Sequence, residues 1–455
     1  MKVSSINSTD ITSYYRLDSL FYLSEGNTAI RLVNNALKNG ALPLHLDDEK
    51  VATIWQPKRN VLVYAGEKEE YIPYLQPYDI LEYLPSERAR LSVHQNDLKE
   101  LRVSSGTILQ TCSGRNLGPL VIADPYLEQF VFGSDLIRIT IPDLTLRYYI
   151  FAFLSTWVGQ ALLHSNKTGS VIDHLSTKSV EEIVVPLFEE KTIQLVSSLI
   201  ERSFNLLSSA RLELDNCKKE FTALIKTNKE YTHLRNGWSV SLKKLSMTNR
   251  IDAAYYDPTV LDAAERLKAN GGCKLKTIAR VFKPGGRYKT NYVKREHGIP
   301  LLSGRQLLQN QIVGAKYLSK TSLQNQDLFS LKTGYIAYPA DGRVEGRLGT
   351  PILITNNRNN WLASVHVGRV IPNEGTHPGY MYLALSHPVV QSQLSALACG
   401  SVVDSVYPED VEDIIVPKQV DFNYDRVVNA WEKFDTADLL KEEACKIIVE
   451  RLISN

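Results

Sequence analysis

Apolar residues spaced three and four positions apart predict two long helices in the chain. The first covers residues 193–224 with a heptad-like seam that only Ser203 interrupts, and the second covers residues 424–453 with a looser seam. The seam positions are Ile193, Val196, Ile200, Leu207, Leu214, Phe221 and Leu224 in the first helix and Trp431, Phe434, Leu440 and Ile448 in the second. Each seam requires an apolar partner, so we expect the two helices to pair within one chain as an antiparallel coiled coil. Pairing between two chains is the alternative.

The regions before each long helix combine short apolar runs with glycine, proline and asparagine turns, a pattern that predicts strands. Residues 332–338 and 413–416 are examples, whereas residues 380–385 predict an interleaved helix. The longest apolar stretch, residues 148–163, contains polar interruptions and is too short for a membrane span, so we expect buried helix there. The predicted fold class is α+β.

The two halves of the sequence repeat each other. Seven short segments recur in the same order, and the distance between paired segments stays between 227 and 234 residues. The pairs are 16–22 with 250–256, 51–57 with 278–284, 71–75 with 298–302, 106–108 with 334–336, 114–118 with 342–346, 169–173 with 400–404, and 180–186 with 411–417. Chance matches would not keep one order and one nearly constant distance, so we predict a tandem duplication of a unit of roughly 230 residues.

The duplication and the helices together predict four segments. Residues 1–188 and 235–420 form two mixed α/β domains, residues 189–234 the central long helix, and residues 421–455 a C-terminal helix that pairs with it. Equivalent helices that pair antiparallel are related by a pseudo-two-fold axis, and their domains then lie at opposite ends.

Charge narrows the possible functions. The 455 residues include 52 Lys and Arg against 50 Asp and Glu, so any nucleic-acid surface must be local. Residues 243–350 contain 19 Lys and Arg against 8 Asp and Glu, whereas residues 1–110 contain 12 against 14. The second half therefore carries the excess of positive charge that phosphate binding requires.

The order of these motifs resembles the DNA-specificity subunit of Type I restriction–modification systems. The resemblance is clearest at residues 275–279 (LKTIA), 298–304 (GIPLLSG) and 332–336 (KTGYI), and through the duplication it covers nearly the whole chain. It implies two target-recognition domains, each reading half of a split DNA site, with the helices as a spacer. The first helix would span roughly 45–50 Å at about 1.5 Å per residue, slightly more than one turn of duplex DNA at about 34–36 Å.

The resemblance also implies partners. These are double-stranded DNA, two modification (methyltransferase) subunits that carry S-adenosylmethionine, and a restriction/translocase subunit, while the chain itself is expected to hold no cofactor. The first half departs from the family pattern at two places: residues 58–59 are Lys-Arg where 285–286 are Gly-Gly, and residues 76–77 are Gln-Pro where 303–304 are Ser-Gly. Residue roles therefore carry over to the first half less directly.

Glycine-bounded loops supply the candidate DNA contacts, because backbone without side chains can approach the duplex and polar neighbours can read base edges. The first candidates are Arg343, Glu345, Arg347, Arg305 and Gln306, with Arg287, Tyr288 and Lys289 as phosphate or base contacts. The candidates in the first half are Arg115, Asn116, Gln76 and Tyr78. The alternative interpretation is that these are solvated turns with structural glycines.

Two other repeated motifs favour structural roles. The Arg-x-Asp-x-x-aromatic-Tyr motif at residues 16–22 and 250–256 is expected to anchor the start of each domain. The Gly-Ser-Val motifs that precede Asp173 and Asp404 are expected to cap a following helix through those carboxylates.

No sequence motif supports catalysis. The Asp/Asn-Pro-Pro-aromatic element with which amino-methyltransferases hold an extruded base is absent, and so is a Gly-x-x-x-x-Gly-Lys-Ser/Thr phosphate loop. The nine histidines lack metal-ligand spacing, so no metal is expected, and residues 47–50 (DDEK) are expected to be an exposed charged turn rather than a nuclease site.

The five cysteines lie far apart and residues 1–20 lack an apolar core, which favours a cytoplasmic protein without disulfides or a signal peptide. We therefore expect a non-catalytic, sequence-specific DNA-binding subunit that reads a bipartite target and docks methyltransferase and restriction subunits. The main alternative is a pseudo-symmetric protein–protein adaptor without sequence-specific DNA binding; a nicking enzyme is a third interpretation.

Overall fold

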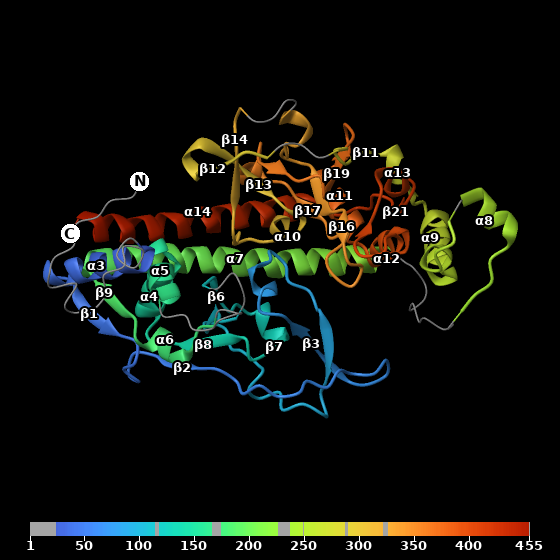
Figure 1. Cartoon of the computed structure of the whole chain (residues 1–455). Helices are drawn as coiled ribbons and strands as arrows, with labels where there is room; N and C mark the ends of the chain where they lie inside the picture. Colours follow the sequence, from blue (N-terminus) through green and yellow to red (C-terminus); the bar gives the residue numbers. More distant parts are fainter. Residues whose placement is uncertain are drawn as a thin grey trace. The chain divides into compact units, whose positions relative to one another are not determined.

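A four-stranded antiparallel sheet organises each half of the chain in a computed structural model (Figure 1). The structure describes residues 24–113, 118–165, 174–225, 237–248, 250–286, 290–321 and 326–454. The chain divides into two units, residues 1–208 with 436–455, and residues 209–435. Each unit thus contains a mixed α/β part and a piece of both long helices.

The first unit contains three sheets. The main sheet has the order β2 (Thr53–Trp55), β8 (Leu136–Thr140), β5 (Ile108–Thr111) and β6 (Leu120–Ile122). In a second sheet, β3 (Tyr71–Leu75) pairs antiparallel with β4 (Ala89–Ser92) and parallel with β7 (Val131–Phe132). A two-stranded sheet joins β1 (Leu42–His45) to β9 (Val184–Leu187). Strand β5 is buried along its whole length, because both of its faces are covered.

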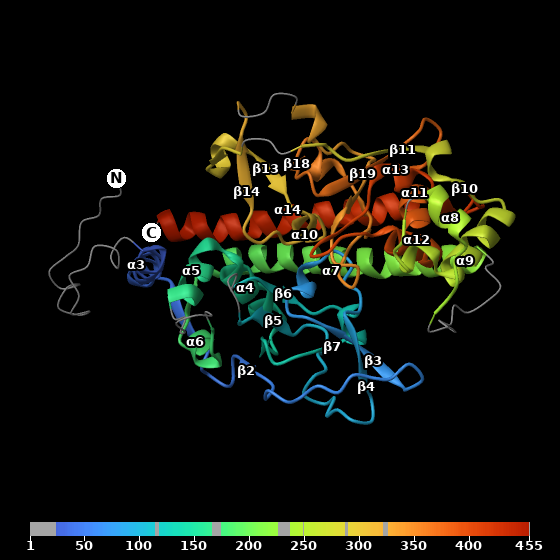
Figure 2. The same ribbon diagram turned by 45° about the vertical axis from the view of Figure 1, so that its right-hand side comes forward.

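The apolar stretch at residues 148–163 forms buried helix, as the sequence predicts. It lies in α4 (Leu144–Ser155), which lies beside β6, and in α5 (Trp157–Ser165), which packs against α3 (Glu25–Lys38) and α4 (Figure 2). Thr156 separates them in an extended conformation, and its hydroxyl accepts a hydrogen bond from the backbone N–H of Gly159. The unit's other short helices are α3 and α6 (Thr177–Glu181).

The second unit has the equivalent strand order. Its main sheet runs β11 (Ala279–Phe282), β19 (Val367–Pro372), β15 (Ile336–Pro339) and β17 (Ile352–Leu353). In the next sheet, β13 (Gly298–Leu302) pairs antiparallel with β14 (Lys316–Ser319) and parallel with β18 (Leu362–Ala363), and β12 (Tyr292–Val293) extends it beyond β14. A two-stranded sheet joins β10 (Cys273–Lys274) to β21 (Ile415–Val416). The repeat in the sequence thus corresponds to a repeat in topology.

The second unit also contains several short helices. They are α8 (Leu242–Thr248), α9 (Pro258–Ala269), α10 (Gly304–Leu307), α11 (Pro378–Ser386), α12 (Pro388–Leu397) and α13 (Pro408–Glu412). Helix α11 covers the predicted helical residues 380–385, β15 overlaps the predicted strand region 332–338, and β21 lies within the predicted region 413–416.

A buried arginine occupies the same position in both main sheets. Arg138 in β8 donates to the carbonyls of Leu136 and Phe132, and Arg369 in β19 donates to those of Val367 and Phe329. Both guanidinium groups donate to backbone carbonyls, and burial lowers the pKa of Arg138 to about 10. The repeated arginine therefore joins the main sheet to a neighbouring segment, strand β7 in the first unit and the segment that contains Phe329 in the second.

The long helices α7 (Glu190–Leu224) and α14 (Asp425–Ser454) contact each other within the first unit. The hydroxyl of Ser203 donates to the carbonyl of Ala437 at 2.7 Å, and Arg451 near the end of α14 pairs with Glu189 just before α7. Residue numbers rise along one segment as they fall along the other, so these segments run antiparallel. Ser203, the polar interruption of the predicted seam, therefore binds the facing helix.

Seam residues of both helices lie in the core of the first unit. Ile193, Val196, Ile200, Leu440 and Ile448 are all at most 9% exposed and belong to one apolar cluster with α4 and the main sheet. Leu207 is half-buried.

The second unit contains the remaining helix segments, which also run antiparallel. Arg426 of α14 contacts Glu213 and Glu220 of α7, each at 2.6 Å, and Lys433 donates to Ser209. The predicted seam residues Leu214, Phe221, Trp431 and Phe434 are buried, whereas Leu224 at the end of α7 is 50% exposed. Among the described residues, no helix is long and apolar enough to cross a membrane.

His387 begins α12 inside the second unit. Its ring accepts a hydrogen bond from the N–H of Val389 through Nδ1, lies edge-on to Phe221 and is 2% exposed. Burial lowers the pKa of His387 to about 4. The equivalent residue of the first unit is Thr156, which begins α5 with a hydroxyl that does not titrate.

We predict that His387→Thr makes the second unit less sensitive to acid. In the unfolded chain the His387 pKa returns to about 6.5, so the unfolded state binds a proton below that pH while the folded state does not. Stability is therefore lost as pH falls from about 6.5 to 4, by about 3 kcal/mol. Urea unfolding across this range should show a flatter pH dependence for His387→Thr, and the exposed His297→Thr should match the wild type. Equal slopes for all three proteins would contradict the assignment.

Candidate nucleic-acid interface

The loop after β16 presents the first group of predicted DNA contacts. Strand β16 (Asp341–Gly342) pairs with β20 (Asp404–Ser405), and the backbone N–H of Val344 donates to the Asp404 carboxylate at 3.1 Å. The N–H of Gly346 donates to the carbonyl of Arg343 and closes the turn. Arg343 and Glu345 are exposed, and Arg347 is half-buried. The loop is thus held at its base while two predicted contacts project into solvent.

The structure contradicts the predicted helix-capping role of Asp404. Its carboxylate caps no helix, because α13 begins only at Pro408 with Tyr407 before it, and Asp404 lies in β20 instead. The hydrogen bond to Val344 gives this carboxylate a different role, as the support of the neighbouring loop. Asp173, its counterpart in the first half, lies outside the described residues.

Arg305 and Gln306 are predicted to lie in a glycine-bounded loop, but the structure places both in the short helix α10. Ser303 and Gln306 form a capping box, and the amide nitrogen of Gln306 donates to the carbonyls of Val313 and Gly314. This placement favours a structural role for Gln306, which the Ser-x-x-Gln spacing already signals. Arg305 is exposed beside it.

The other predicted contacts are placed unevenly. Arg287, Tyr288, Lys289, Arg115 and Asn116 lie outside the described residues. Gln76 is exposed, and the hydroxyl of half-buried Tyr78 donates to the carbonyl of Ser113 at 3.4 Å. The structure therefore brings Tyr78 next to Ser113, directly before the predicted loop at 114–118.

A half-buried carboxylate lies at the base of the loop after β16. Asp341 contacts the Lys283 amine at 2.6 Å through Oδ1 and accepts from Nδ1 of His366 at 2.5 Å through Oδ2. Burial raises the pKa of Asp341, but hydrogen bonds from Lys283, His366 and Ser405 outweigh it and hold the pKa below its usual value. Asp341 is therefore a charged anchor that joins four segments of the chain. We call Lys283, Asp341, His366 and Ser405 the second polar hub.

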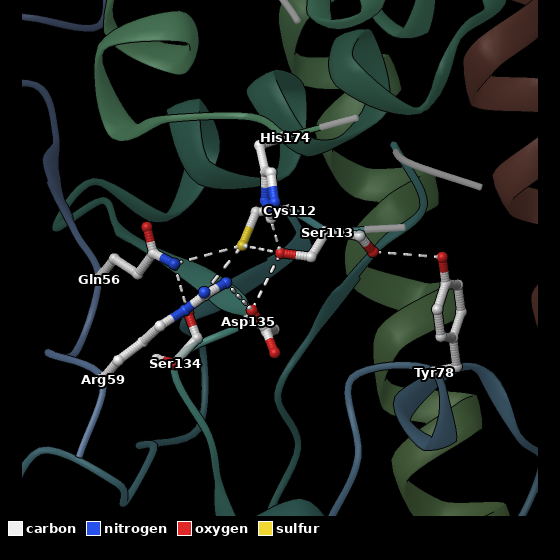
Figure 3. Close-up of polar contacts among 8 residues, drawn as sticks. All are labelled: Gln56, Arg59, Tyr78, Cys112, Ser113, Ser134, Asp135 and His174. Carbon is white, nitrogen blue, oxygen red and sulfur yellow. Dashed lines mark hydrogen bonds and ion pairs between the residues drawn. The ribbon is translucent and has the colours of Figure 1, made fainter. Parts of the chain in front are cut away.

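The first unit has a polar cluster at the same place (Figure 3). The hydroxyl of Ser113 donates to Asp135 at 2.9 Å and lies 3.1 Å from Nδ1 of His174, while Arg59 pairs with Asp135 at 3.1 Å. The amide of Gln56 donates to Sγ of Cys112 and to the carbonyl of Ser134. We call Gln56, Ser113, Asp135 and His174 the first polar hub.

The two hubs occupy equivalent positions with permuted residues. The corresponding pairs are Gln56 with Lys283, Ser113 with Asp341, Asp135 with His366, and His174 with Ser405. Their separations are 227, 228, 231 and 231 residues, the same as those of the neighbouring repeat segments. Each hub contains one aspartate, one histidine and one serine, at different repeat positions in the two units. Local sequence patterns do not reveal either hub, because the members of each are scattered along the chain.

The first hub has the residue types of a nucleophilic triad but not its geometry. In such a triad the carboxylate orients the histidine, and the histidine accepts the proton of the serine. Here the Ser113 hydroxyl donates to Asp135 itself, so the carboxylate competes with His174 for that proton. Burial raises the pKa of the neighbouring Cys112 to about 11, which keeps its thiol protonated. The arrangement favours a structural network.

Within the described ranges, no group of three or more His, Cys, Asp and Glu side chains could hold a metal ion. Residues 47–50 form an exposed turn in which the N–H of Lys50 donates to Asp48, as the sequence predicts.

The Arg-x-Asp motif of the second half has a structural role. Arg250 pairs with Asp252 at 2.7 Å and Asp410 at 3.3 Å, donates to the carbonyl of Leu397, and lies over the ring of Tyr255. It joins the start of the α/β part of the second unit to α13, which agrees with the predicted anchoring role. The first copy, residues 16–22, lies outside the described residues.

Comparison with protein-family models found no match, and neither did comparison with curated proteins. Among solved structures, the Type I restriction–modification S subunit from M. genitalium is 14% identical, over 91% of this chain and 95% of that one, with a TM-score of 0.30. The HsdS subunit from Thermoanaerobacter tengcongensis is 11% identical, over 91% and 96%, with a TM-score of 0.28. A third structure, of type I R-M system assembly, is 11% identical, over 88% and 97%, with a TM-score of 0.29.

The chain is thus similar along most of its length to Type I restriction–modification S subunits, in a mixed α+β fold with long helices. The superpositions are loose and the identities low, so the function proposed for this chain rests on its own repeat, loops and charge.

Proposed function

We propose that the chain is the sequence-specific DNA-binding subunit of a Type I restriction–modification complex and reads a bipartite target. The observation that carries this proposal is the repetition of one topology, with a glycine-bounded arginine segment at the same place in the sequence of each copy. Two copies of one DNA-reading domain suit a target that is made of two half-sites. A single continuous site would need only one.

Charge supports DNA as the ligand of the second unit. The 19 Lys and Arg against 8 Asp and Glu in residues 243–350 provide the phosphate-neutralising component of binding, and exposed Arg343, Glu345 and Arg305 provide groups that can read bases. Arg347, Arg287, Tyr288 and Lys289 join them as further contacts. The first unit would use Arg115, Asn116, Gln76 and Tyr78 over a less basic surface.

The long helices serve, in this proposal, as the spacer between half-sites. Residues 1–188 and 235–420 are the target-recognition domains, and residues 189–234 and 421–455 form a pseudo-two-fold-symmetric antiparallel coiled coil. The antiparallel contacts within each unit support this arrangement. Two methyltransferase subunits with bound S-adenosylmethionine, and a restriction subunit, would dock on the cytoplasmic complex and supply its chemistry, while this chain remains non-catalytic.

Selection from a random duplex library tests this function against the adaptor alternative. The full chain should enrich two short defined blocks separated by a constant gap, and its affinity for that duplex should fall steeply with salt because binding releases counterions from phosphates. A protein–protein adaptor would enrich no sequence and bind DNA only weakly. Absence of enrichment at low salt would contradict the proposal.

We predict that Arg343→Ala weakens specific binding more than non-specific binding. A good arginine–base contact is worth about 1–3 kcal/mol of discrimination, so the preference for the selected duplex over a scrambled one should fall about tenfold. Arg266→Ala, which removes an exposed arginine of α9, is the charge-matched control and should leave the preference unchanged. Equal losses on both duplexes would make Arg343 a phosphate contact only.

We predict that shortening both long helices shortens the gap between half-sites. Removing residues 200–206 and 434–440, each centred on one partner of the Ser203–Ala437 hydrogen bond, keeps the heptad register. Seven residues span about 10 Å, or about three base pairs at ~3.4 Å each. A repeated library selection should return a gap shorter by about that amount. The triple variant Glu201→Ala/Arg202→Ala/Asn205→Ala, which changes exposed positions at constant length, should keep the original gap; an unchanged gap in the deletion variant would contradict the spacer role.

A further inference from the structure

The second polar hub joins the base of the exposed loop to the rest of its unit. Asp341 begins that loop, Lys283 follows β11, His366 lies in the turn before β19, and Ser405 lies in β20. The side chains of Lys283 and Asp341 are only 15% and 13% exposed. One carboxylate therefore fixes the mutual positions of four segments that are distant in sequence.

We propose that Asp341 is a specificity-determining positioning residue for the second half-site. Held by Lys283 and His366, it keeps the loop at 342–347 in the one conformation that directs Arg343 and Glu345 at a base edge. This inference rests on the proposed DNA-reading function and adds the residue that sets its geometry. Asp341 itself contacts no base in this proposal, because it is turned into its unit.

The energetics of a half-buried ion pair favour positioning over stability. Removing a charge from water costs free energy that the attraction between Lys283 and Asp341 roughly returns, so such a pair adds little net stability compared with apolar residues of similar size. The pair instead restrains the loop backbone, because a carboxylate with fixed donors on both oxygens allows only a narrow range of backbone positions. The Asp404–Val344 hydrogen bond restrains the loop from its other side.

The first polar hub supports the same role in the other unit. It also joins the residue directly before the repeat segment at 114–118 to two other segments, through Ser113, Asp135 and His174. An ion pair is present there too, between Arg59 and Asp135, but it is formed by residues at other positions than in the second hub. A network that persists while its residues exchange places indicates that its connections matter more than any one side chain.

The test compares library-selected half-sites for the full chain and two variants. Lys283→Met/Asp341→Met removes the ion pair without leaving a lone buried charge, so its melting temperature should stay within a few degrees of the wild type. Its preference at the second half-site should fall about tenfold, as for a lost base contact, while the first half-site keeps its preference as an internal control. Asp262→Met/Arg266→Met, which removes an exposed ion pair of α9, should change neither half-site.

Each outcome is decisive. A wild-type chain that selects no half-sites refutes the proposed function itself. A wild type that selects two half-sites, with a folded double variant that retains both preferences, refutes the positioning role alone. His366→Phe keeps the test valid should the double variant unfold: the residue is 60% exposed on its side chain, so folding should persist while the second half-site loses at least threefold in preference. Full preference in His366→Phe would then overturn the inference.

Discussion

Burial of the apolar seams on α7 and α14 is the constraint on which both units depend. In the first unit, Leu440, Ala444, Ile448 and Leu452 belong to the same apolar core as the main sheet, although they come from the last twenty residues of the chain. Fully burying one leucine or isoleucine contributes about 1.5–3 kcal/mol, so this segment is a substantial part of the unit's stability. The second unit depends in the same way on Phe221 of α7 and on Trp431 and Phe434 of α14. Neither unit is complete without a helix segment that lies outside its own α/β part.

Duplication followed by divergence explains how two similar units would serve the two different half-sites that we propose. The elements that determine topology are kept, including the strand order and the buried arginines Arg138 and Arg369. The elements proposed to meet DNA differ, because the second unit has the excess of basic residues and the first does not. The two polar hubs combine both behaviours, because their positions are kept in the two units while the residues at those positions are exchanged. A framework that stays constant while its loops change is suited to acquiring new target sequences.

Local patterns predicted the helices well and the polar networks poorly. The three-and-four spacing located α7 and α14 to within a few residues, and the apolar stretch at 148–163 was correctly interpreted as buried helix, because both signals lie within one segment. Asp404 was assigned to a helix cap from its local sequence, whereas its partner Val344 is sixty residues away. The hubs join residues separated by more than 20 positions, which no local periodicity reports. Gln306 differs from the hub residues, because the Ser-x-x-Gln spacing of its capping box is a local pattern that the sequence shows.

The central claim is that one chain carries two reading units whose separation determines the form of the DNA target. Methylome sequencing of a host that expresses this chain together with its methyltransferase partner tests it most directly. The account predicts methylation, dependent on this chain, in a motif of two short defined blocks separated by a fixed number of unspecified bases. Methylation in one continuous motif, or an identical pattern when this chain is deleted, would contradict it.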